Sequence, residues 1–265
     1  MAGAHNGVSA KLVERNGFDA IWASSFEIST TYCVPDASIL SMSEFLEVSR
    51  TMAEAVSTPI IADCDSGYGD AANVFHMTRK YEAAGVAAVC IEDKEFPKTN
   101  SFIEGRQNLA TIAQFAEKIQ AAVRARASAD LMVFARIEAL VANQGLEEAL
   151  RRAHAYADAQ ADVILIHSKE RTPDEVLEFA RRWKNRTPLA IIPTTYHGIT
   201  QEQIRNAGVQ FVIYANHAMR SAVRAMDQTL ARIASTRSSA AVEEEIASMK
   251  ELFDLQGMKE LKAMR

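Results

Sequence analysis

Short apolar runs alternate with longer stretches of helical periodicity along most of the chain. The runs are rich in β-branched residues and end in polar residues, which is typical of strands that are buried on both faces. Seven such runs occur, at 19–24, 59–65, 86–93, 131–138, 162–168, 188–194 and 211–217. Amphipathic stretches between them predict helices over 41–56, 70–85, 109–127, 145–160 and 172–185.

Strand and helix alternating in this way indicate a parallel sheet that is covered by helices. Seven units fit either a wide doubly wound sheet or a closed (β/α)8 barrel, and the length of 265 residues favours the barrel. An eighth strand would have to lie at residues 1–5, because no further run is visible inside the chain. No linker rich in Gly, Ser or Pro divides the chain, so we predict one α/β barrel domain over 1–265.

The segment 239–257 predicts a last helix, beyond the predicted barrel. Its apolar stripe is formed by Ile246, Met249, Leu252, Phe253 and Leu255. A helix added after a complete barrel must bury such a stripe. It can pack on its own barrel or be exchanged between subunits of an oligomer.

Composition narrows the kind of partner. The chain has 34 acidic and 29 basic residues and a net charge of −5, with no Lys/Arg block, which argues against nucleic-acid and membrane surfaces. A small molecule or another protein remains as the expected partner.

Cys33, Cys64 and Cys90 lie far apart, which predicts neither a zinc site nor a disulfide framework and fits a reducing cytoplasm. No apolar run approaches the roughly 20 residues of a membrane span, and the start lacks the apolar region of a signal peptide.

Polar residues close the predicted strands, where a parallel barrel builds its active site. They are Trp22, Ser24, Asp63, Asp65, Glu92, Asp93, Arg136, Glu138, His167, Ser168, Thr194, Asn216 and His217. Carboxylates gather on one side of this ring, and Arg and His on the other. This asymmetry predicts a site for a divalent cation and an anionic substrate.

Asp63 and Asp65 are two residues apart, so both carboxylates can face one ligand while Cys64 points into the wall. Oxygen ligands without His or Cys suit Mg²⁺, with Mn²⁺ as the alternative, rather than zinc. Glu92 at the end of the next strand and Asp36 in an upstream loop extend the cluster. The alternative is that these are solvated acids at strand ends.

Arg136 offers a guanidinium fork that matches a carboxylate or a phosphate-type oxyanion. The alternative for Arg136 is a buried ion pair with Glu138 or a neighbouring acid. His167 can contact a ligand or be a satisfied histidine of the core. The residues alone leave both questions open.

The segment 92–107 is too polar for a strand and, with Pro97 and Gly105, too broken for a helix. A long polar loop at the catalytic face predicts a lid that excludes water from the substrate. A closed lid would deliver Lys98, Asn100 and Ser101. The alternative is a solvated connection.

At these residues the sequence resembles the phosphonate branch of the phosphoenolpyruvate mutase/isocitrate lyase superfamily. The matching motifs are AHNGVSAKLVERNGFDAIWAS, IADCDSGYGD, IEDKEFPKTNS, ARIEA, LIHSK, IPTTY, ANHAMRSAV and SMKELFDLQG. The resemblance implies a (β/α)8 barrel with Mg²⁺ at the strand ends and a terminal helix that is swapped between subunits. It also implies a homo-oligomer, either a dimer or a dimer of dimers.

The resemblance further implies roles for individual residues. Asp63 would be the direct metal ligand, and the residues that hold metal-bound waters would be Asp36, Asp65 and Glu92. Trp22 and Ser24 would line the substrate, with the backbone amides of Ser24 and Ser25 gripping its carboxylate and oxyanion. The phosphonyl contacts would be Arg136, His167, Asn100 and Ser101. The catalytic set would be Asp36, Asn100, Arg136 and His167.

The lid distinguishes the activities of this branch. It reads KTNS without the Cys of a KxCGH motif, which disfavours a C–C lyase. Asn100 resembles the mutases, whereas hydrolases tend to have Thr there. The stretch YCVPDASILSMS at 32–43 looks more like the hydrolases, and Ser25 replaces a usual Gly. We therefore predict a mutase that interconverts the C3 acids phosphoenolpyruvate and phosphonopyruvate. The alternatives are a phosphonopyruvate hydrolase, a mutase for a carboxylated analogue, and a barrel without enzymatic activity.

Overall fold

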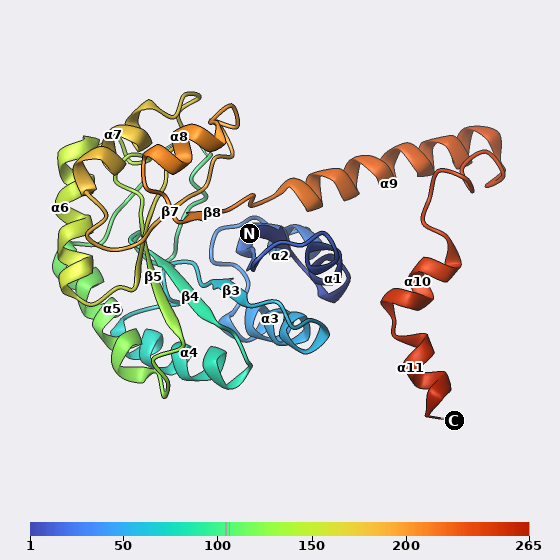
Figure 1. The fold of residues 1–265 in the computed structure, drawn as a ribbon, viewed down its shortest axis with the longest axis horizontal. Helices are drawn as coiled ribbons and strands as arrows, with labels where there is room; N and C mark the ends of the chain where they lie inside the picture. The colour runs from blue at the N-terminus through green and yellow to red at the C-terminus, as the bar shows by residue number, and fades with distance from the viewer. Residues whose placement is uncertain (104, 106, 265) are drawn as a thin grey trace. The chain divides into compact units, whose positions relative to one another are not determined.

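A computed structural model describes residues 1–103, 105 and 107–264 of the chain (Figure 1). Glu104 and Arg106, which belong to the predicted lid, lie outside the described residues. One parallel sheet has its eight strands in the order of the sequence. The strands are β1 (Ala2–Ala4), β2 (Ile21–Ala23), β3 (Ile60–Asp63), β4 (Ala88–Glu92), β5 (Met132–Ile137), β6 (Val163–Ile166), β7 (Leu189–Ile191) and β8 (Phe211–Val212). The predicted barrel and its seven internal strands are confirmed.

The first residues of the chain close the sheet. Ala2 forms a parallel bridge with Tyr214, just beyond β8. The Gly3 amide donates to the Tyr214 carbonyl at 2.9 Å, and the Tyr214 amide donates to the Met1 carbonyl at 3.0 Å. The expectation of an eighth strand within residues 1–5 is therefore confirmed.

Helices follow the strands and cover the outside of the barrel. They are α1 (Gly7–Arg15), α2 (Ser25–Thr31), α3 (Met42–Ala55), α4 (Ala71–Ala83), α5 (Ile112–Ala125), α6 (Gly145–Asp158), α7 (Asp174–Trp183) and α8 (Gln201–Asn206). The five predicted helices correspond to α3 through α7. Their starts are fixed locally: the Asp70 side chain, for example, accepts from the amides of Ala72 and Asn73 at the start of α4.

Residues 217–265 form a second compact unit, separate from Met1–Asn216. It contains α9 (His217–Thr236), α10 (Met249–Leu255) and α11 (Met258–Ala263). Whether the two units act as one domain stays a prediction.

The predicted helix over 239–257 is wrong in its first half. Successive turns run from 240 to 245, and α10 begins only after Ser248. The Ser248 hydroxyl accepts from the Glu251 amide, and the Glu251 carboxylate accepts from the Ser248 amide, so this capping box sets the start of the helix. Four of the five apolar residues of the predicted stripe are exposed in the single chain, with Met249 at 62%, and Leu255 is partly buried.

None of the described helices is both long and apolar enough to cross a bilayer.

Gly3 allows β1 to approach its neighbours closely. A Cβ atom at this position would lie 2.0 Å from Glu27 Oε1 and 2.1 Å from the Ala215 carbonyl oxygen. Because a backbone atom cannot move aside cheaply, we expect Gly3→Ala to lower the free energy of unfolding by about 3 kcal/mol. Urea unfolding followed by tryptophan fluorescence measures this change.

Gly7→Ala is the matched control, because its new Cβ would meet nothing closer than 3.5 Å. Equal unfolding midpoints for the two variants would contradict this account of barrel closure.

Candidate active site

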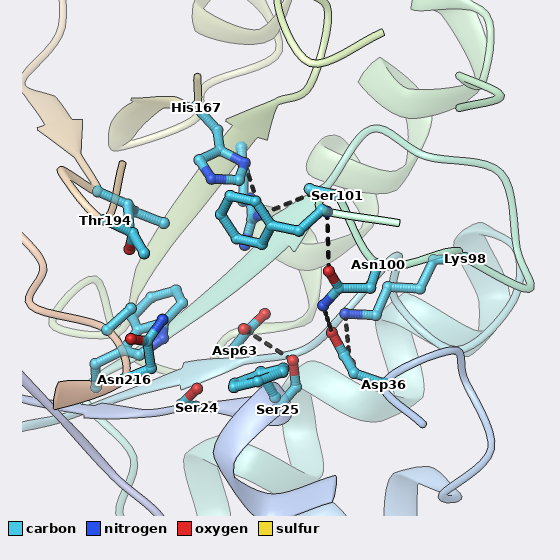
Figure 2. A pocket seen from close by; sticks show the side chains of 16 residues that line it. Ser24, Ser25, Asp36, Asp63, Lys98, Asn100, Ser101, His167, Thr194 and Asn216 are labelled. Atoms are coloured by element: carbon cyan, nitrogen blue, oxygen red, sulfur yellow. Dashed lines mark hydrogen bonds and ion pairs between the residues drawn. The ribbon is translucent and has the colours of Figure 1, made fainter. Parts of the chain in front are cut away.

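A cavity of about 550 Å³, part of it open to solvent, lies at the carboxyl ends of the strands (Figure 2). It is lined by Trp22, Ser24, Ser25, Phe26, Asp36, Asp63, Lys98, Asn100, Ser101, Phe102, Arg136, His167, Ile192, Thr194, Ala215 and Asn216. The structure therefore brings the predicted substrate-binding residues together. Asp65 and Glu92 are buried beside this cavity. The roles of these residues stay predictions.

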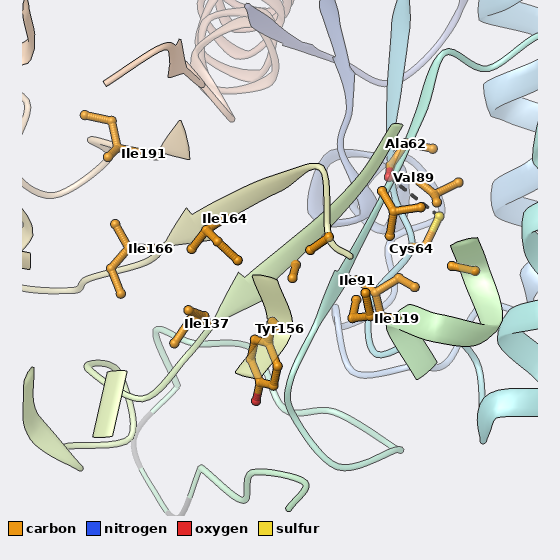
Figure 3. Packing of buried hydrophobic residues seen from close by; sticks show 14 of the residues in the cluster. Ala62, Cys64, Val89, Ile91, Ile119, Ile137, Tyr156, Ile164, Ile166 and Ile191 are labelled. Atoms are coloured by element: carbon orange, nitrogen blue, oxygen red, sulfur yellow. Dashed lines mark hydrogen bonds between the residues drawn. The ribbon is translucent and has the colours of Figure 1, made fainter. Parts of the chain in front are cut away.

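The alternation of side chains along each strand explains this arrangement. Cys90 and Phe134 belong to a cluster of buried residues inside the barrel, and Glu92 and Arg136 follow them by two positions on β4 and β5. Outward-facing neighbours such as Ile91 pack in the other cluster, between sheet and helices (Figure 3). Since side chains alternate with a period of two, the inner face of the barrel continues directly into the site.

The side chains of Asp36, Asp63, Asp65 and Glu92 form a buried acidic cluster, with the Asp36 side chain 6%, Asp65 1% and Glu92 2% exposed. The alternative of solvated acids is therefore wrong. Lys98 is the cation of this cluster: its ammonium lies 2.8 Å from Asp36 Oδ1 and 2.8 Å from Asp65 Oδ1.

Burial and mutual repulsion make the carboxyl groups of Asp63 and Asp65 reluctant to ionise. Burial raises the pKa of Asp63 above its usual value, although Lys98 and Arg136 oppose this. Burial also raises the pKa of Asp65 to about 7, against the attraction of Lys98. For Asp36 burial acts in the same direction, but Lys98 and the hydrogen bond from Asn100 outweigh it, so its pKa is lowered.

Two oxygen atoms of the cluster indicate that it fits a cation. Asp65 Oδ2 and Glu92 Oε1 are buried and accept no hydrogen bond from the described residues. Around no point within the described residues do three His, Cys, Asp or Glu side chains converge closely enough to hold an ion directly. The oxygen-only donor set therefore suits a hydrated Mg²⁺ whose waters reach most of the carboxylates.

Ser25 contributes a contact that the sequence did not predict. Its hydroxyl donates to Asp63 Oδ2 at 2.9 Å. The expectation for Ser24 needs correction, because its amide donates to the Ala4 carbonyl at 3.1 Å and is not free for a ligand. The Ser24 hydroxyl instead accepts from the Glu27 amide and caps α2.

Arg136 and His167 form the basic side of the cavity, and each contacts the carboxylate of Glu138. Arg136 Nε donates to Glu138 Oε1 at 2.6 Å, and His167 Nδ1 lies 2.8 Å from the same oxygen. Arg136 thus makes the ion pair with Glu138 and also lines the cavity. The positive neighbours, Arg136 first, hold the pKa of Glu138 well below its usual range even though burial would raise it.

The predicted lid reaches into the site through residues 98–101. Asn100 Nδ2 donates to Asp36 Oδ2 at 2.7 Å (Figure 2). The Lys98 amide donates to the Ser38 hydroxyl at 3.0 Å. Lys98 and Ser101 are buried. The alternative of a merely solvated connection is therefore wrong for this part of the segment.

Sequence reasoning missed Lys94. It placed Glu138 among the residues that close the strands, but gave it no role beyond an ion pair with Arg136. Both are nearly inaccessible to solvent, with Lys94 at 2% and Glu138 at 0% exposure. The missed signal was again the period of two, since Lys94 follows Glu92, and Glu138 follows Arg136, by two residues. Asp93, between these positions, turns away and accepts from Arg152 and Tyr156.

Comparisons with known proteins agree on one family. The sequence model described as phosphoenolpyruvate phosphomutase matches residues 1–234. A phosphonopyruvate hydrolase from Variovorax sp. (strain Pal2) is 48% identical over 263 residues, which are 98% of this chain and 91% of that protein.

Similar solved structures carry the same two names. The crystal structure of a phosphoenolpyruvate phosphomutase from Streptomyces platensis subsp. rosaceus has a TM-score of 0.97 and 52% identity, covering 99% of this chain and 91% of that chain. The structure of a phosphonopyruvate hydrolase in complex with oxalate and Mg²⁺ has a TM-score of 0.93 and 46% identity, with coverage of 99% and 91%.

The buried His167 makes stability depend on pH. Burial lowers its pKa below the ordinary 6.5, although Glu138 opposes the shift. As the pH falls, His167 therefore takes up a proton in the unfolded chain before it does so in the folded chain. The contribution of neutral His167 to the free energy of unfolding is present above pH 6.5 and is lost as the pH falls toward its lower pKa in the folded state. We expect His167→Gln to lose less unfolding free energy than the wild type between about pH 7.5 and about pH 5.5.

Urea unfolding at both pH values tests this expectation. His197→Gln is the control, because His197 is exposed and should keep the wild-type pH dependence. Identical pH dependence in the His167 variant and the wild type would refute the assignment.

Proposed function

The chain belongs to the phosphoenolpyruvate phosphomutase family, and we propose that it is a Mg²⁺-dependent mutase that interconverts phosphoenolpyruvate and phosphonopyruvate. The observation that carries the proposal is the position of Asn100. Its amide group is held over the cavity by Asp36, beside the Lys98 ammonium. This contact supports a role of the segment as a lid, which would exclude water from a phosphoryl group in transfer.

In the direction of phosphoenolpyruvate, the C–P bond of phosphonopyruvate breaks and its electron pair passes to the pyruvate enolate. The phosphoryl group then bonds to the enolate oxygen, so the reaction consumes no water and no net proton. Such a loose transfer needs positioning and charge more than a base. Bound Mg²⁺ would neutralise charge on the carboxylate and the enolate oxygen.

The residues of the chain divide this work. Asp63 would bind the metal directly, and Asp36, Asp65 and Glu92 would hold its waters. Arg136 and His167, opposite this cluster, would bind the phosphonyl oxygens together with Asn100. Trp22, Ser24 and Ser25 line the cavity beside Asp63 and would contact the three-carbon acid. The free thiols Cys33, Cys64 and Cys90 fit our proposal that the enzyme works in the cytoplasm.

A phosphonopyruvate hydrolase is the second candidate. It is favoured by the 48% identity to the Variovorax hydrolase and by the segment 32–43, which supplies Asp36 and Ser38 to the lid contacts. A hydrolase would use the same metal and anion contacts but admit one water to the phosphoryl group. The products are then pyruvate and phosphate.

³¹P NMR of the enzyme with phosphonopyruvate and Mg²⁺ separates the two candidates. We expect a phosphoenolpyruvate signal that grows without inorganic phosphate, and no turnover after the metal is removed by EDTA. Inorganic phosphate growing in step with pyruvate would make the protein a hydrolase.

The same assay tests the lid. We expect Asn100→Ala to lower kcat by about 100-fold or more, because the reacting group loses a positioned contact and its cover. Asn108→Ala is the control, since Asn108 is exposed and lies just beyond the segment 92–107. Unchanged turnover in the Asn100 variant, with an unchanged melting temperature, would remove the lid from the mechanism.

We also propose that residues 217–265 join subunits into a homo-oligomer by exchange of the terminal helix. The exposed apolar side chains of α10 support this, with Leu252 at 39% and Phe253 at 43% exposure.

Light scattering of the purified protein tests the exchange. We expect the wild type to be a dimer or a dimer of dimers, and the double variant Leu252→Asp, Phe253→Asp to have a smaller mass. Met264→Asp is the control, because Met264 is 81% exposed and lies outside α10. A wild-type mass in the double variant would contradict the exchange.

A further inference from the structure

We propose that Glu138 and Lys94 are positioning residues that make the orientation of Arg136 and His167 depend on closure of the lid. The inference rests on the proposed function, in which these two side chains bind the phosphonyl group. Neither Glu138 nor Lys94 lines the cavity within the described residues. Both would act through the residues that do.

Glu138 is the common acceptor of the anion-binding side. Oε1 accepts from Arg136 Nε at 2.6 Å and lies 2.8 Å from His167 Nδ1, while Oε2 accepts from the Ser101 hydroxyl at 2.7 Å. One carboxylate with no exposed surface therefore holds three side chains that line the cavity, from β5, from the end of β6 and from the lid.

Glu138 competes with Glu92 for the guanidinium of Arg136. Arg136 Nε also lies 3.5 Å from Glu92 Oε2, which belongs to the acidic cluster. Without Glu138, the guanidinium would move toward that cluster and compete with the cation for Glu92. Glu138 therefore keeps the anion-binding arginine and the cation site apart.

The backbone of Glu138 is itself fixed. Its amide donates to Asp93 Oδ1 at 2.9 Å, and Asp93 Oδ2 accepts from Arg152 at 2.9 Å and from Tyr156 at 2.8 Å. These contacts tie the end of β5 to α6. Glu138 is thus a rigid point against which the other groups are set.

Lys94 connects Glu138 to the lid. Its ammonium donates to the Thr99 carbonyl at 2.8 Å and to the Ser101 hydroxyl at 2.7 Å, and it lies 3.5 Å from Glu138 Oε2. The single proton of the Ser101 hydroxyl is directed to Glu138. Ser101 in this arrangement has no hydroxyl proton for a substrate, so its side chain acts through Glu138.

Closure of the lid and orientation of the anion-binding side chains therefore depend on the same buried network of hydrogen bonds and ion pairs. If the lid opens, Glu138 loses Ser101, and Lys94 loses both of its acceptors on the lid. Leaving a buried charge without its partners costs free energy. The network therefore stabilises the closed lid together with the oriented Arg136, and opening of the lid would disturb both.

Glu138→Gln tests the network, because it keeps the shape of the side chain and removes the charge. We expect kcat for phosphonopyruvate to fall by about 100-fold, as expected for misplaced binding groups. We also expect faster hydrogen exchange in peptides that cover 95–103. Binding of oxalate with Mg²⁺, measured by calorimetry, should weaken much less than binding of phosphonopyruvate, because the displaced guanidinium competes only for Glu92 and oxalate has no phosphonyl group to lose.

Lys94→Gln is the second variant, since Glu138→Gln leaves buried cations unpaired and can fail to fold. It keeps the contacts of Glu138 with Arg136 and His167. We expect kcat to fall by about tenfold, the scale of one hydrogen bond to a charged group, again with faster exchange over 95–103. Glu95→Gln is the matched control, because Glu95 is exposed on the same segment and should leave every readout unchanged.

The outcomes separate this inference from the proposed function. Wild-type kcat together with wild-type exchange in the folded variants would overturn the positioning roles. An equal loss of oxalate and phosphonopyruvate binding in Glu138→Gln would also overturn them, because the defect would then not be specific to the phosphonyl end. If the wild type itself does not convert phosphonopyruvate, the proposed function fails. Faster exchange confined to 95–103 in both variants would still support the coupling.

Discussion

The structure depends on the burial of like charges at one end of the barrel. Asp36, Asp63, Asp65 and Glu92 meet in a space that solvent hardly reaches. Carboxylates cannot ionise together there unless cations compensate them, because desolvation and mutual repulsion both favour the neutral form. Lys98 balances part of this charge, and the unpaired oxygens of Asp65 and Glu92 leave room for a hydrated divalent cation. The lid that carries Lys98 is therefore held closed by the same carboxylates that would bind the metal.

The barrel holds the acidic cluster and the basic Arg136 close together but keeps them from pairing fully. Glu92 and Arg136 are direct partners in the register of β4 and β5, and both end strands whose inner faces are otherwise apolar. Glu138 then draws Arg136 away from Glu92. A cation site and an anion site can thus lie side by side without neutralising each other. This arrangement suits the substrate that we propose, which carries a carboxylate and a phosphonyl group.

The proposed mutase and the alternative hydrolase differ in a single molecule of water, and the family contains relatives with either name at similar identity. The metal and anion contacts of the cavity would therefore serve either reaction in our proposal. The reaction would then depend on whether the closed lid, with Asn100, keeps water away from the phosphoryl group. The contacts of Asn100 and Ser101 matter for this reason, although neither side chain supplies a proton or a nucleophile in the transfer.

The sequence by itself determined the strands, the main helices and the direction of Asp63, Glu92, Arg136 and His167, because a period of two along buried strands fixes which side chains face inward. Only the tertiary structure decided which of these groups pair. Glu138 collects side chains from three separate segments, and the Ser24 amide is taken by β1, which follows from strand pairing and not from local pattern. The prediction of a helix over 239–257 was wrong in its first half, because the helical pattern of the sequence extends upstream of Ser248, whereas the Ser248 cap sets the start of α10. Local alternation carries information about direction, whereas partners across a barrel are set by register and closure, which depend on contacts distant in the chain.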